Sequence, residues 1–354
     1  MTDVEITNIS KELTRLWDEA QGQNKTRASV FNLIVYVQQK TRVEHYEAMV
    51  RKVVSKFPSR VIFIIADERK DENYLNTAVS SQTVGEGDLQ IFCEMIKIEV
   101  GGTFKKQVPF LVIPQILADL PVYLLWTQDP TRENEILPHL EPYANRIIFD
   151  AERNINLQEF SKTIHALAKS FSCEVGDLHW SAISGWRTLL KETFNSESAI
   201  EALDDAQHIT ISYVKGGQET EAAYIQAWLA SRLGWKFQDF ELIEGNIRIS
   251  YRRPTHEVVI FLKPVELNTL YPGAILSIEI ESNIQEKHYM LTRNSSSRQV
   301  TVQISDAEKC ELPITGYISG VKAGQEIIEE IFYPAPKNHY QSMLDTLSHI
   351  PWRL

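Results

Sequence analysis

The sequence predicts an α/β fold in which an N-terminal domain with a mostly parallel sheet and flanking helices precedes a C-terminal α+β domain with an antiparallel meander. In the first half, apolar and β-branched segments begin roughly thirty residues apart, about the length of one β-α-β unit. These segments are nearly continuous in apolar residues, which indicates strands covered on both faces of a parallel sheet. In the second half, short alternating runs lie close together between turn residues, a spacing typical of an antiparallel meander.

Five strands and two helices are predicted in the first half. Asn156, with Glu159 three residues later, forms a capping box that starts the second helix. Segment 91–100 alternates more regularly than the other strands, which indicates an edge or antiparallel strand. The polar stretch 68–90 has no helical pattern and is predicted to be a loop. The strands are 29–37, 60–67, 91–100, 121–129 and 146–152, and the helices are 41–57 and 156–171.

A strand, a glycine turn and a helix open the second half. The strand is predicted at 208–214 and the helix from about Thr220 to Leu233, where Gly234 is placed to cap the helix end. Further strands are predicted at 246–253, 256–264, 274–282, 287–294 and 298–305, and terminal helices at about 323–332 and 338–348. The domains predicted from this order are 1–175 (the α/β domain), 176–206 (a helical connector) and 207–354 (the α+β domain).

The charge of the chain argues against nucleic acid and membrane surfaces as partners. The 354 residues include 36 basic and 47 acidic side chains, which leaves a net charge of −11. Such a field repels phosphate backbones and anionic lipids. The N-terminal residues include acids and no long apolar stretch, so no signal peptide is expected. The longest apolar runs, such as 61–66, are far shorter than the ~18 residues that a membrane helix needs.

Cysteine and histidine spacing predicts neither a metal site nor a disulfide framework. Cys93, Cys173 and Cys310 lie far apart in the sequence and form no C-x-x-C pair, which favours a reducing, cytoplasmic location. The nine histidines show no H-x-x-x-H or H-E-x-x-H pattern. No G-x-S-x-G motif that would hold a nucleophilic serine occurs either. The sequence therefore predicts no catalytic residue and no cofactor.

The first half holds two patterns that ligand-binding α/β proteins use. Gly85 and Gly87 lack the third glycine and the following helix of a dinucleotide fingerprint, which favours a simple loop turn. Asp67, Asp129 and Asp150 end three of the predicted parallel strands, where clustered acids could bind a cation or sugar hydroxyls. Aspartate is also common where a strand gives way to a turn or a helix cap, and this second interpretation is favoured.

The turn that opens the second half is a weak candidate for an anion site. Lys215, Gly216 and Gly217 stand between a strand and a helix, where backbone N–H groups can hold an anion. The helix start also carries Glu219 and Glu221, whose negative charges oppose a phosphate. The turn is therefore expected to be a structural bend.

Three of four closely spaced tryptophans are predicted to lie in the core. Tyr224, Trp228 and Trp235 share one face of a predicted helix and its end, and neighbouring apolar residues broaden that face, as expected for a buried helix. Trp186 begins another helix in which Leu189 and Leu190 face inward, so it too is expected in the core.

The fourth tryptophan is the predicted anchor for a protein partner. Trp180 precedes a break in periodicity at Gly185, so its burial is less certain from the pattern. Arg187 lies nearby, and Arg232 extends past the tryptophan stripe of the other helix. Tryptophan and arginine are enriched at binding hot spots. Trp180, Arg187 and Arg232 are therefore the predicted partner-binding residues.

Seven segments, in matching order and spacing, resemble the glucose-6-phosphate dehydrogenase assembly protein family, also called OpcA. The resemblance runs from Arg27 to Trp235 and is looser beyond. The chain departs from the family pattern D-L-x-W-x-R at Ala182, and it has Thr127 where the family tends to show a second Trp after Trp126. The segments are RASVFNLIVYV, SRVIFIIAD, CEMIKIEVGG, LPVYLLWTQDP, ANRIIFDAE, DLHWSAISGWR and AAYIQAWLASRLGW.

The resemblance implies an accessory protein of the oxidative pentose phosphate pathway. Such a protein binds glucose-6-phosphate dehydrogenase, promotes its active oligomer and raises its activity without catalysing the reaction itself. A homo-oligomer of the chain stays open. The competing hypothesis is a sugar-phosphate-binding enzyme or metabolite sensor that uses the strand ends of the α/β domain. An enzyme must turn over substrate alone, whereas an assembly factor must do nothing until the dehydrogenase is added.

Overall fold

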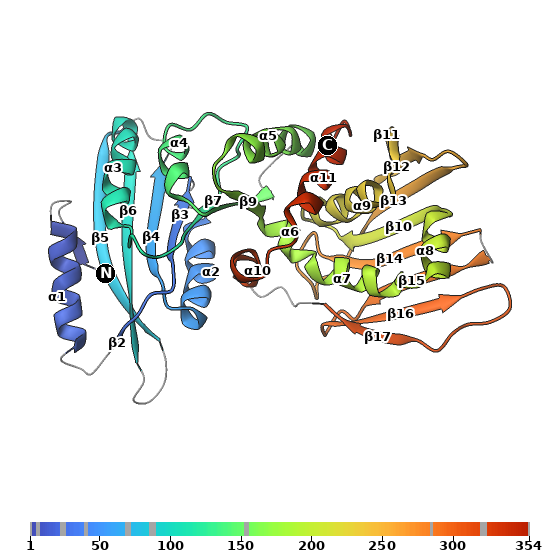
Figure 1. Ribbon diagram of the computed structural model, residues 1–354, viewed down its shortest axis with the longest axis horizontal. Coiled ribbons are helices and arrows are strands. Elements are labelled where there is room, and N and C mark those ends of the chain that lie inside the picture. Colours follow the sequence, from blue (N-terminus) through green and yellow to red (C-terminus); the bar gives the residue numbers. More distant parts are fainter. Residues whose placement is uncertain are drawn as a thin grey trace. The chain divides into compact units, whose positions relative to one another are not determined.

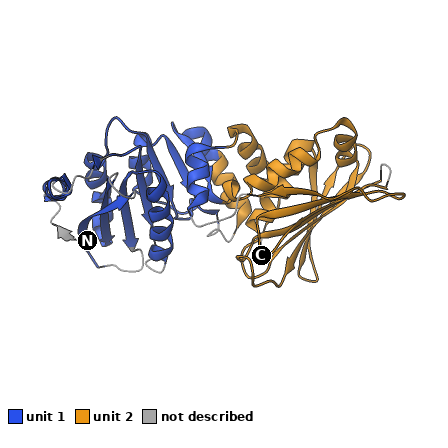
Figure 2. Cartoon of the chain, turned by 90° about the horizontal axis from the view of Figure 1, so that it is seen from below, with its two compact units in different colours: residues 1–153, 166–178, 322–334 blue, residues 154–165, 179–321, 335–354 orange. Residues whose placement is uncertain are grey.

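A computed structural model describes residues 2–4, 8–21, 26–38, 42–67, 72–84, 90–151, 156–283, 286–318 and 324–352. The chain divides into two compact units (Figure 2). Unit 1 comprises 1–153, 166–178 and 322–334, and unit 2 comprises 154–165, 179–321 and 335–354. Both units are discontinuous in sequence, whereas the three predicted domains are continuous. The predicted boundaries at 175 and 206 stay a prediction.

The sheet of unit 1 is mostly parallel, as predicted (Figure 1). Its strand order is β1-β5-β6-β4-β3-β7-β8-β9, and β2 pairs with β6. Only the β1–β5 and β5–β6 pairs are antiparallel among the strands of this sheet that the structure describes. The strands are β1 (Thr2–Val4), β2 (Thr26–Arg27), β3 (Asn32–Val37), β4 (Arg60–Asp67), β5 (Tyr74–Val84), β6 (Ile91–Gly101), β7 (Val122–Trp126), β8 (Arg146–Phe149) and β9 (Glu174–Asp177).

The predicted loop at 68–90 is wrong over β5, which is an eleven-residue strand. Only Thr77, Ala78 and Val79 are buried in it, so its sequence lacks the apolar run that marks the central strands. The predicted antiparallel partner of β6 exists and is β5. The edge position predicted as the alternative for β6 is wrong, because β5 and β1 lie outside it. Strand β9 was not predicted, since four residues are too few for a periodic pattern.

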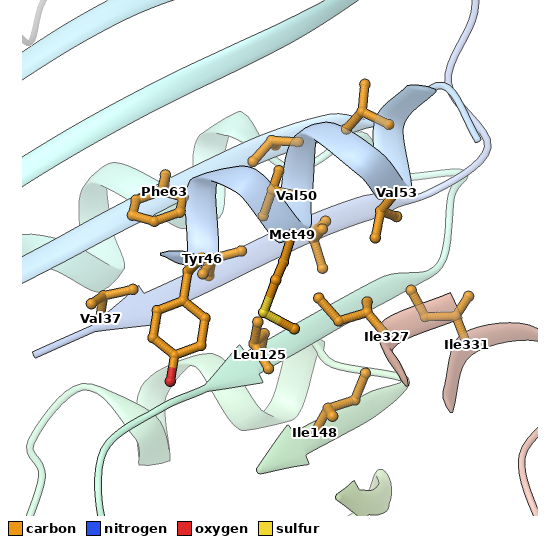
Figure 3. Close-up of a cluster of buried hydrophobic side chains, with 14 of the residues drawn as sticks. Val37, Tyr46, Met49, Val50, Val53, Phe63, Leu125, Ile148, Ile327 and Ile331 are labelled. Atoms are coloured by element: carbon orange, nitrogen blue, oxygen red, sulfur yellow. The ribbon is translucent and has the colours of Figure 1, made fainter. Parts of the chain in front are cut away.

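A helix from near the end of the chain completes the core of unit 1 (Figure 3). On one face of the sheet, α2 (Val43–Lys56) contributes Met49 and Val53, and α10 (Gln325–Phe332) contributes Ile327 and Ile331. Within unit 1, Nη1 of Arg146 on β8 lies 2.8 Å from Oε2 of Glu330 on α10, and both residues are buried. Apolar burial and an internal ion pair therefore hold α10 to this unit.

The remaining helices of unit 1 are short, apart from α1 and from α5, which begins in unit 2 and ends in unit 1. The backbone N–H of Glu159 donates to Oδ1 of Asn156 at 3.1 Å, so the predicted cap of α5 is confirmed. The helices are α1 (Ile9–Gln21), α3 (Val108–Val112) and α4 (Leu137–Leu140), with α5 (Leu157–Ser170) shared between the two units, and the 3-10 turns are η3 (Gly102–Gln107), η4 (Ile113–Gln115) and η5 (Glu141–Tyr143).

The sheet of unit 2 is mostly antiparallel, as predicted, with the order β11-β12-β13-β10-β14-β15-β16-β17. The single parallel pair among its described strands is β10–β13, so β10 interrupts the predicted meander between β13 and β14. Strand β11 was not predicted because most of its residues are exposed. The strands are β10 (Ala206–Val214), β11 (Lys236–Ile243), β12 (Asn246–Arg252), β13 (Glu257–Val265), β14 (Ile275–Ser282), β15 (His288–Arg293), β16 (Gln299–Ser305) and β17 (Ile314–Tyr317).

Unit 2 also carries five helices or helical segments among its described residues. Helix α9 ends at Gly234, whose φ of 68° is left-handed, so the predicted glycine cap is confirmed. No helix in the described ranges is both long and apolar enough to cross a membrane. The helices are α6 (Leu178–Ala182), α7 (Ser184–Thr193), α8 (Glu197–Asp204), α9 (Thr220–Leu233) and α11 (Lys337–Ser348).

Candidate functional site

The carboxyl ends of the parallel strands are where an open α/β sheet usually holds its ligand. In unit 1 the chain runs outward from β3 in both directions, through β4 and β6 on one side and through β7, β8 and β9 on the other. Ligands of such sheets bind in the crevice beside this reversal, and a glycine-rich turn after the first strand holds the phosphates. Here the segment after β3 reads QQKTR (38–42) and contains no glycine.

Side chains of the chain itself occupy this edge. The rings of Tyr36 on β3 and Trp126 on β7 stack with centroids 3.9 Å apart and planes 8° from parallel, and both are buried. Nδ2 of Asn134 donates to the Tyr36 hydroxyl at 3.2 Å and to Oε1 of Gln128. Thr127, one of the departures from the family pattern, donates from Oγ1 to the Tyr36 carbonyl at 2.9 Å. This network joins the ends of two adjacent strands.

Two of the acids at the strand ends, Asp129 and Asp150, bond other residues of the chain itself. The buried Asp150 accepts a hydrogen bond from the Tyr46 hydroxyl, and its Oδ2 lies 3.7 Å from Nη1 of Arg42. Asp129 accepts from the backbone N–H and the hydroxyl of Thr131 at 2.9 and 2.7 Å, which is an Asx turn. No group of three potential metal-ligating side chains occurs in the described ranges. The turn interpretation therefore fits Asp129, whereas Asp150 contacts side chains from a distant segment of the chain.

Two elements of the sequence hypotheses lie outside the described residues. These are the glycines of the 84–90 stretch, Gly85 and Gly87, and the side chain of Asp67. The loop turn at the two glycines and the role of the Asp67 carboxylate stay predictions.

The Lys215-Gly216-Gly217 turn is tightly packed. Gly216 has a φ of 99°, and a Cβ on Gly217 would lie 2.6 Å from the carbonyl carbon of Pro272. Nζ of Lys215 lies 2.9 Å from Oε1 of Glu266, with both side chains exposed, and this contact lowers the pKa of Glu266. The lysine therefore pairs with a carboxylate of the chain itself.

Two buried carboxylates stand at the start of the following helix, α9. Oε1 of Glu219 accepts from the indole N–H of Trp352 at 2.8 Å, and Oε1 of Glu221 accepts from the Tyr271 hydroxyl at 2.8 Å. Negative charge at this position is stabilised by the positive end of the helix dipole and repels a phosphate. This arrangement favours the structural bend over the weak anion site at residues 215–217.

The surface position expected for Trp180 is wrong. Its side chain is only 2% exposed, because Arg187 and Tyr340 cover its indole. Cζ of the Arg187 guanidinium lies 3.5 Å from the Trp180 ring centroid, and the Tyr340 ring lies 5.5 Å away. Tyr340 belongs to α11, which is far from Trp180 in sequence, so local periodicity carries no sign of this packing. A partner cannot contact this indole without a rearrangement.

Of the other three tryptophans, two are buried as predicted and one is not. Trp186 and Trp235 are buried, as predicted. Trp228, predicted to be in the core, is only half-buried. Nearly every residue of α9 from Thr220 to Ala230 is buried, so the helix has no single inward face that a periodic stripe could identify.

Three cationic side chains act electrostatically on one imidazole in unit 2, and we call the four groups the cationic cluster: Arg187 and Lys191 on α7, Arg232 on α9 and His339 on α11. The pKa of His339 is lowered by burial first, and then by the positive charges of Arg232, Arg187 and Lys191. Lys191 and Arg232 are exposed, while Arg187 and His339 are half-buried. Two of the three predicted partner-binding residues, Arg187 and Arg232, thus act on the same imidazole, and the third, Trp180, stacks on Arg187.

Sequence reasoning missed two members of the cationic cluster. Lys191 lies four residues after Arg187 on α7, a spacing that places both side chains on one helix face and that could have identified it. His339 carried no such signal, because its neighbours in the cluster come from distant helices.

The three cysteines show no arrangement for redox chemistry. All three are free, and only Cys310 is exposed. Burial raises the pKa of the Cys93 thiol, and it raises that of Cys173 to about 12. Since the thiolate is the reactive form, both buried thiols are poor nucleophiles.

Comparisons with known proteins cover most of the chain. Residues 50–169 match the family model of the glucose-6-phosphate dehydrogenase subunit N-terminal domain, and residues 173–316 match that of the C-terminal domain. A protein of Nostoc punctiforme named as an OxPP cycle protein OpcA is 26% identical over 162 residues, which are 45% of this chain and 34% of that protein. A protein of the same name in Synechocystis is 25% identical over 186 residues, or 52% and 38% of the two chains.

The matched region is thus little more than a third of either relative. Among solved structures, a 3-ketoreductase from Actinomadura kijaniata superimposes with a TM-score of 0.51 at 11% identity, covering 90% of this chain and 95% of the other. At that identity the superposition shows a shared fold and nothing of function. The two family models together leave only a short gap between residues 50 and 316, and the chain belongs to the OpcA glucose-6-phosphate dehydrogenase assembly family.

Proposed function

We propose that the chain is a non-catalytic accessory protein that binds glucose-6-phosphate dehydrogenase, promotes its active oligomer and raises its activity in the oxidative pentose phosphate pathway. The observation that carries the proposal is the family membership, because the matching models bear the name of a subunit of that dehydrogenase and cover parts of both units. The proposed site of action is the cytoplasm.

The geometry at the strand ends supports a role without catalysis. The crevice position beside β3 is where a dehydrogenase of this fold class would hold its dinucleotide. In this chain the Tyr36–Trp126 stack and the Tyr46–Asp150–Arg42 contacts lie there, and no glycine turn follows β3. A bound pyrophosphate would have to displace satisfied, buried polar groups, which costs free energy.

The competing function, a sugar-phosphate-binding enzyme or metabolite sensor, finds no support in the same geometry. Lys215 pairs with Glu266, and Glu219 and Glu221 occupy the helix start beside the turn. A phosphate arriving there meets negative charge. We therefore propose the accessory role alone, with Arg187 and Arg232 as partner-facing residues and Trp180 as the support that holds Arg187.

The test mixes the purified chain with the dehydrogenase of its own organism and follows NADPH formation and elution volume. The chain alone is expected to form no NADPH from glucose 6-phosphate and NADP. Added to the dehydrogenase, it should raise the rate and shift the elution of the enzyme to a larger species. Equal rates with and without the chain over a wide range of concentrations would contradict the proposal, as would turnover by the chain alone.

A further inference from the structure

The sheet of unit 2 ends in two edge strands, β11 and β17, that differ in how they are protected. An edge strand presents unpaired backbone N–H and C=O groups, and proteins usually shield it with charged side chains or bulges. Strand β11 carries the charged residues Lys236, Asp239 and Glu241, and its register with β12 shifts between Phe237 and Asp239. Such a charged and bulged edge resists pairing with another chain.

Strand β17 and the residues just before it lack this protection. We call residues 312–317 the β17 edge; its sequence LPITGY contains no charged residue, although 23% of the chain is charged. Leu312, Ile314 and Tyr317 are 90%, 59% and 69% exposed. Strand β17 pairs only with β16 among the described strands (Figure 1). An uncharged edge with exposed apolar side chains is a template for pairing with a further strand.

The backbone of the β17 edge determines which residues a further strand would meet. The N–H of Ile318 donates to the carbonyl of Arg298, just before β16, at 3.0 Å. Backbone hydrogen bonding alternates from residue to residue along an antiparallel strand, so Gly316 also directs its N–H and C=O toward β16. Thr315 and Tyr317 therefore direct theirs away from β16, which leaves two donors and two acceptors facing outward.

These outward groups match those of a second copy of the same edge. In an antiparallel arrangement with a two-fold axis at Gly316, Thr315 of one copy lies opposite Tyr317 of the second copy, and the reverse. Each of the two pairs exchanges two backbone hydrogen bonds, so four form in total. The same register places the exposed Ile314 opposite Ile318 of the second copy, which gives its side chain an apolar neighbour.

Charge and rigidity also favour pairing between two copies at this edge. The net charge of −11 makes two copies of the chain repel one another, and this repulsion is weakest where no charged side chains face each other. Residues 312–318 carry no charge. Gly316 packs so closely on α7 that a Cβ would lie 2.4 Å from Cδ1 of Leu189, so helix α7 supports the strand. A strand held in place in this way loses little conformational entropy when it pairs.

We propose that two copies of the chain form a symmetric dimer in which their β17 edges pair antiparallel about Gly316. The sheet of unit 2 then continues from one copy into the other. The inference goes beyond the proposed function and does not rest on it, because it concerns the chain alone and needs no dehydrogenase.

Sedimentation of the full chain at increasing concentration, combined with amide hydrogen exchange, tests the proposal. We expect a reversible equilibrium between monomer and dimer. As the dimer fills, the amides of Thr315 and Tyr317 should exchange more slowly, because they become hydrogen-bonded across the two copies. The amides of β11, the other edge of the same sheet, should keep the same exchange rate and serve as the internal control.

A proline substitution isolates the outward hydrogen bonds. Thr315→Pro removes an outward donor and no bond to β16, a position at which an edge strand tolerates proline. Two hydrogen bonds are lost per dimer, so the dissociation constant should rise about tenfold or more. The matched control Thr315→Ala keeps the N–H and should stay within about threefold of wild type. Thermal midpoints within a few degrees of wild type show that both variants fold.

Four results would overturn the proposal. The chain stays a monomer at every concentration, or it forms a dimer while the amides of Thr315 and Tyr317 exchange at the monomer rate. A folded Thr315→Pro variant dimerises as well as wild type. Protection of these amides that develops only when glucose-6-phosphate dehydrogenase is added would assign the β17 edge to a strand of that enzyme in place of a second copy.

Discussion

The strand ends of unit 1 and the cationic cluster of unit 2 are built from the same kinds of residue but differ in how their charges are satisfied. Trp126 at the strand ends and Trp180 beside the cationic cluster are both buried against a second aromatic ring, and both regions contain arginine. At the strand ends, Arg42 lies beside Asp150, and the polar groups bond one another. In the cationic cluster, Lys191 and Arg232 are exposed and form no ion pair within the described residues.

The difference teaches where to look for function in a protein with no visible catalytic motif. A position that the fold class reserves for ligands can be closed by internal hydrogen bonds, and its residues then serve stability. Exposed cations without an internal ion pair stay accessible to solvent and to other molecules. The predictions that follow test each side of this comparison, starting with the largest effect.

The largest loss of stability is expected when Trp180, the ring on which Arg187 stacks, is truncated. Trp180→Ala removes a fully buried indole and should lower the free energy of unfolding by about 3–5 kcal/mol, as large aromatic truncations do. Urea unfolding measures it, with Trp228→Ala as the matched control. Because Trp228 is half-buried, its truncation should cost clearly less. An unchanged midpoint for Trp180→Ala, combined with weakened dehydrogenase binding, would restore the hypothesis of a surface anchor.

The second-largest loss of stability is expected at the strand ends of unit 1. Asp150→Asn keeps the size of the side chain but removes the charge beside Arg42 and weakens the acceptor of the Tyr46 hydroxyl. We expect a loss of about 2–3 kcal/mol in the free energy of unfolding, the usual cost of leaving buried polar partners poorly satisfied. Once folded, the variant should still raise dehydrogenase activity. If its stability is unchanged but activation is lost, Asp150 acts in function and the comparison fails.

His339 should make the stability of the folded chain depend on pH. Its pKa in the folded chain is below the ordinary value of 6.5, so the unfolded chain binds the proton more readily. Its contribution to stability is therefore present above pH 6.5 and is lost as the pH falls through the lowered pKa. His339→Gln should flatten the decline of the thermal midpoint between about pH 7 and 5. Identical pH profiles for the two proteins would show that burial and the neighbouring cations do not lower the pKa of this imidazole.

The smallest effect is expected at the Lys215 turn. Lys215→Ala removes an exposed ion pair with Glu266, and exposed pairs contribute little to stability. The thermal midpoint should stay within error of wild type, and calorimetry should detect no glucose 6-phosphate binding by either protein. Binding that is present in wild type and absent in the variant would favour the metabolite-sensor hypothesis.

Local patterns predicted those parts of the fold that a single segment controls. The continuous apolar runs of β3 and β4 marked central strands, because residues buried on both faces leave no polar alternation. Asn156 and Gly234 marked helix ends, because a cap involves only a few neighbouring residues. The polar strand β5 escaped prediction, since it is recognisable only beside β6.

The sequence by itself thus determined the fold class, the family and the absence of a recognisable catalytic motif, and it selected Arg187 and Arg232. Only the tertiary structure decided that Trp180 is buried while Trp228 is half-buried, that α10 completes unit 1, and that Lys191 and His339 join the two arginines. The physical reason is that periodicity reports which face of one element is apolar. Burial and electrostatic fields depend on what packs across from that face, and in this protein the packing elements lie far away in the chain.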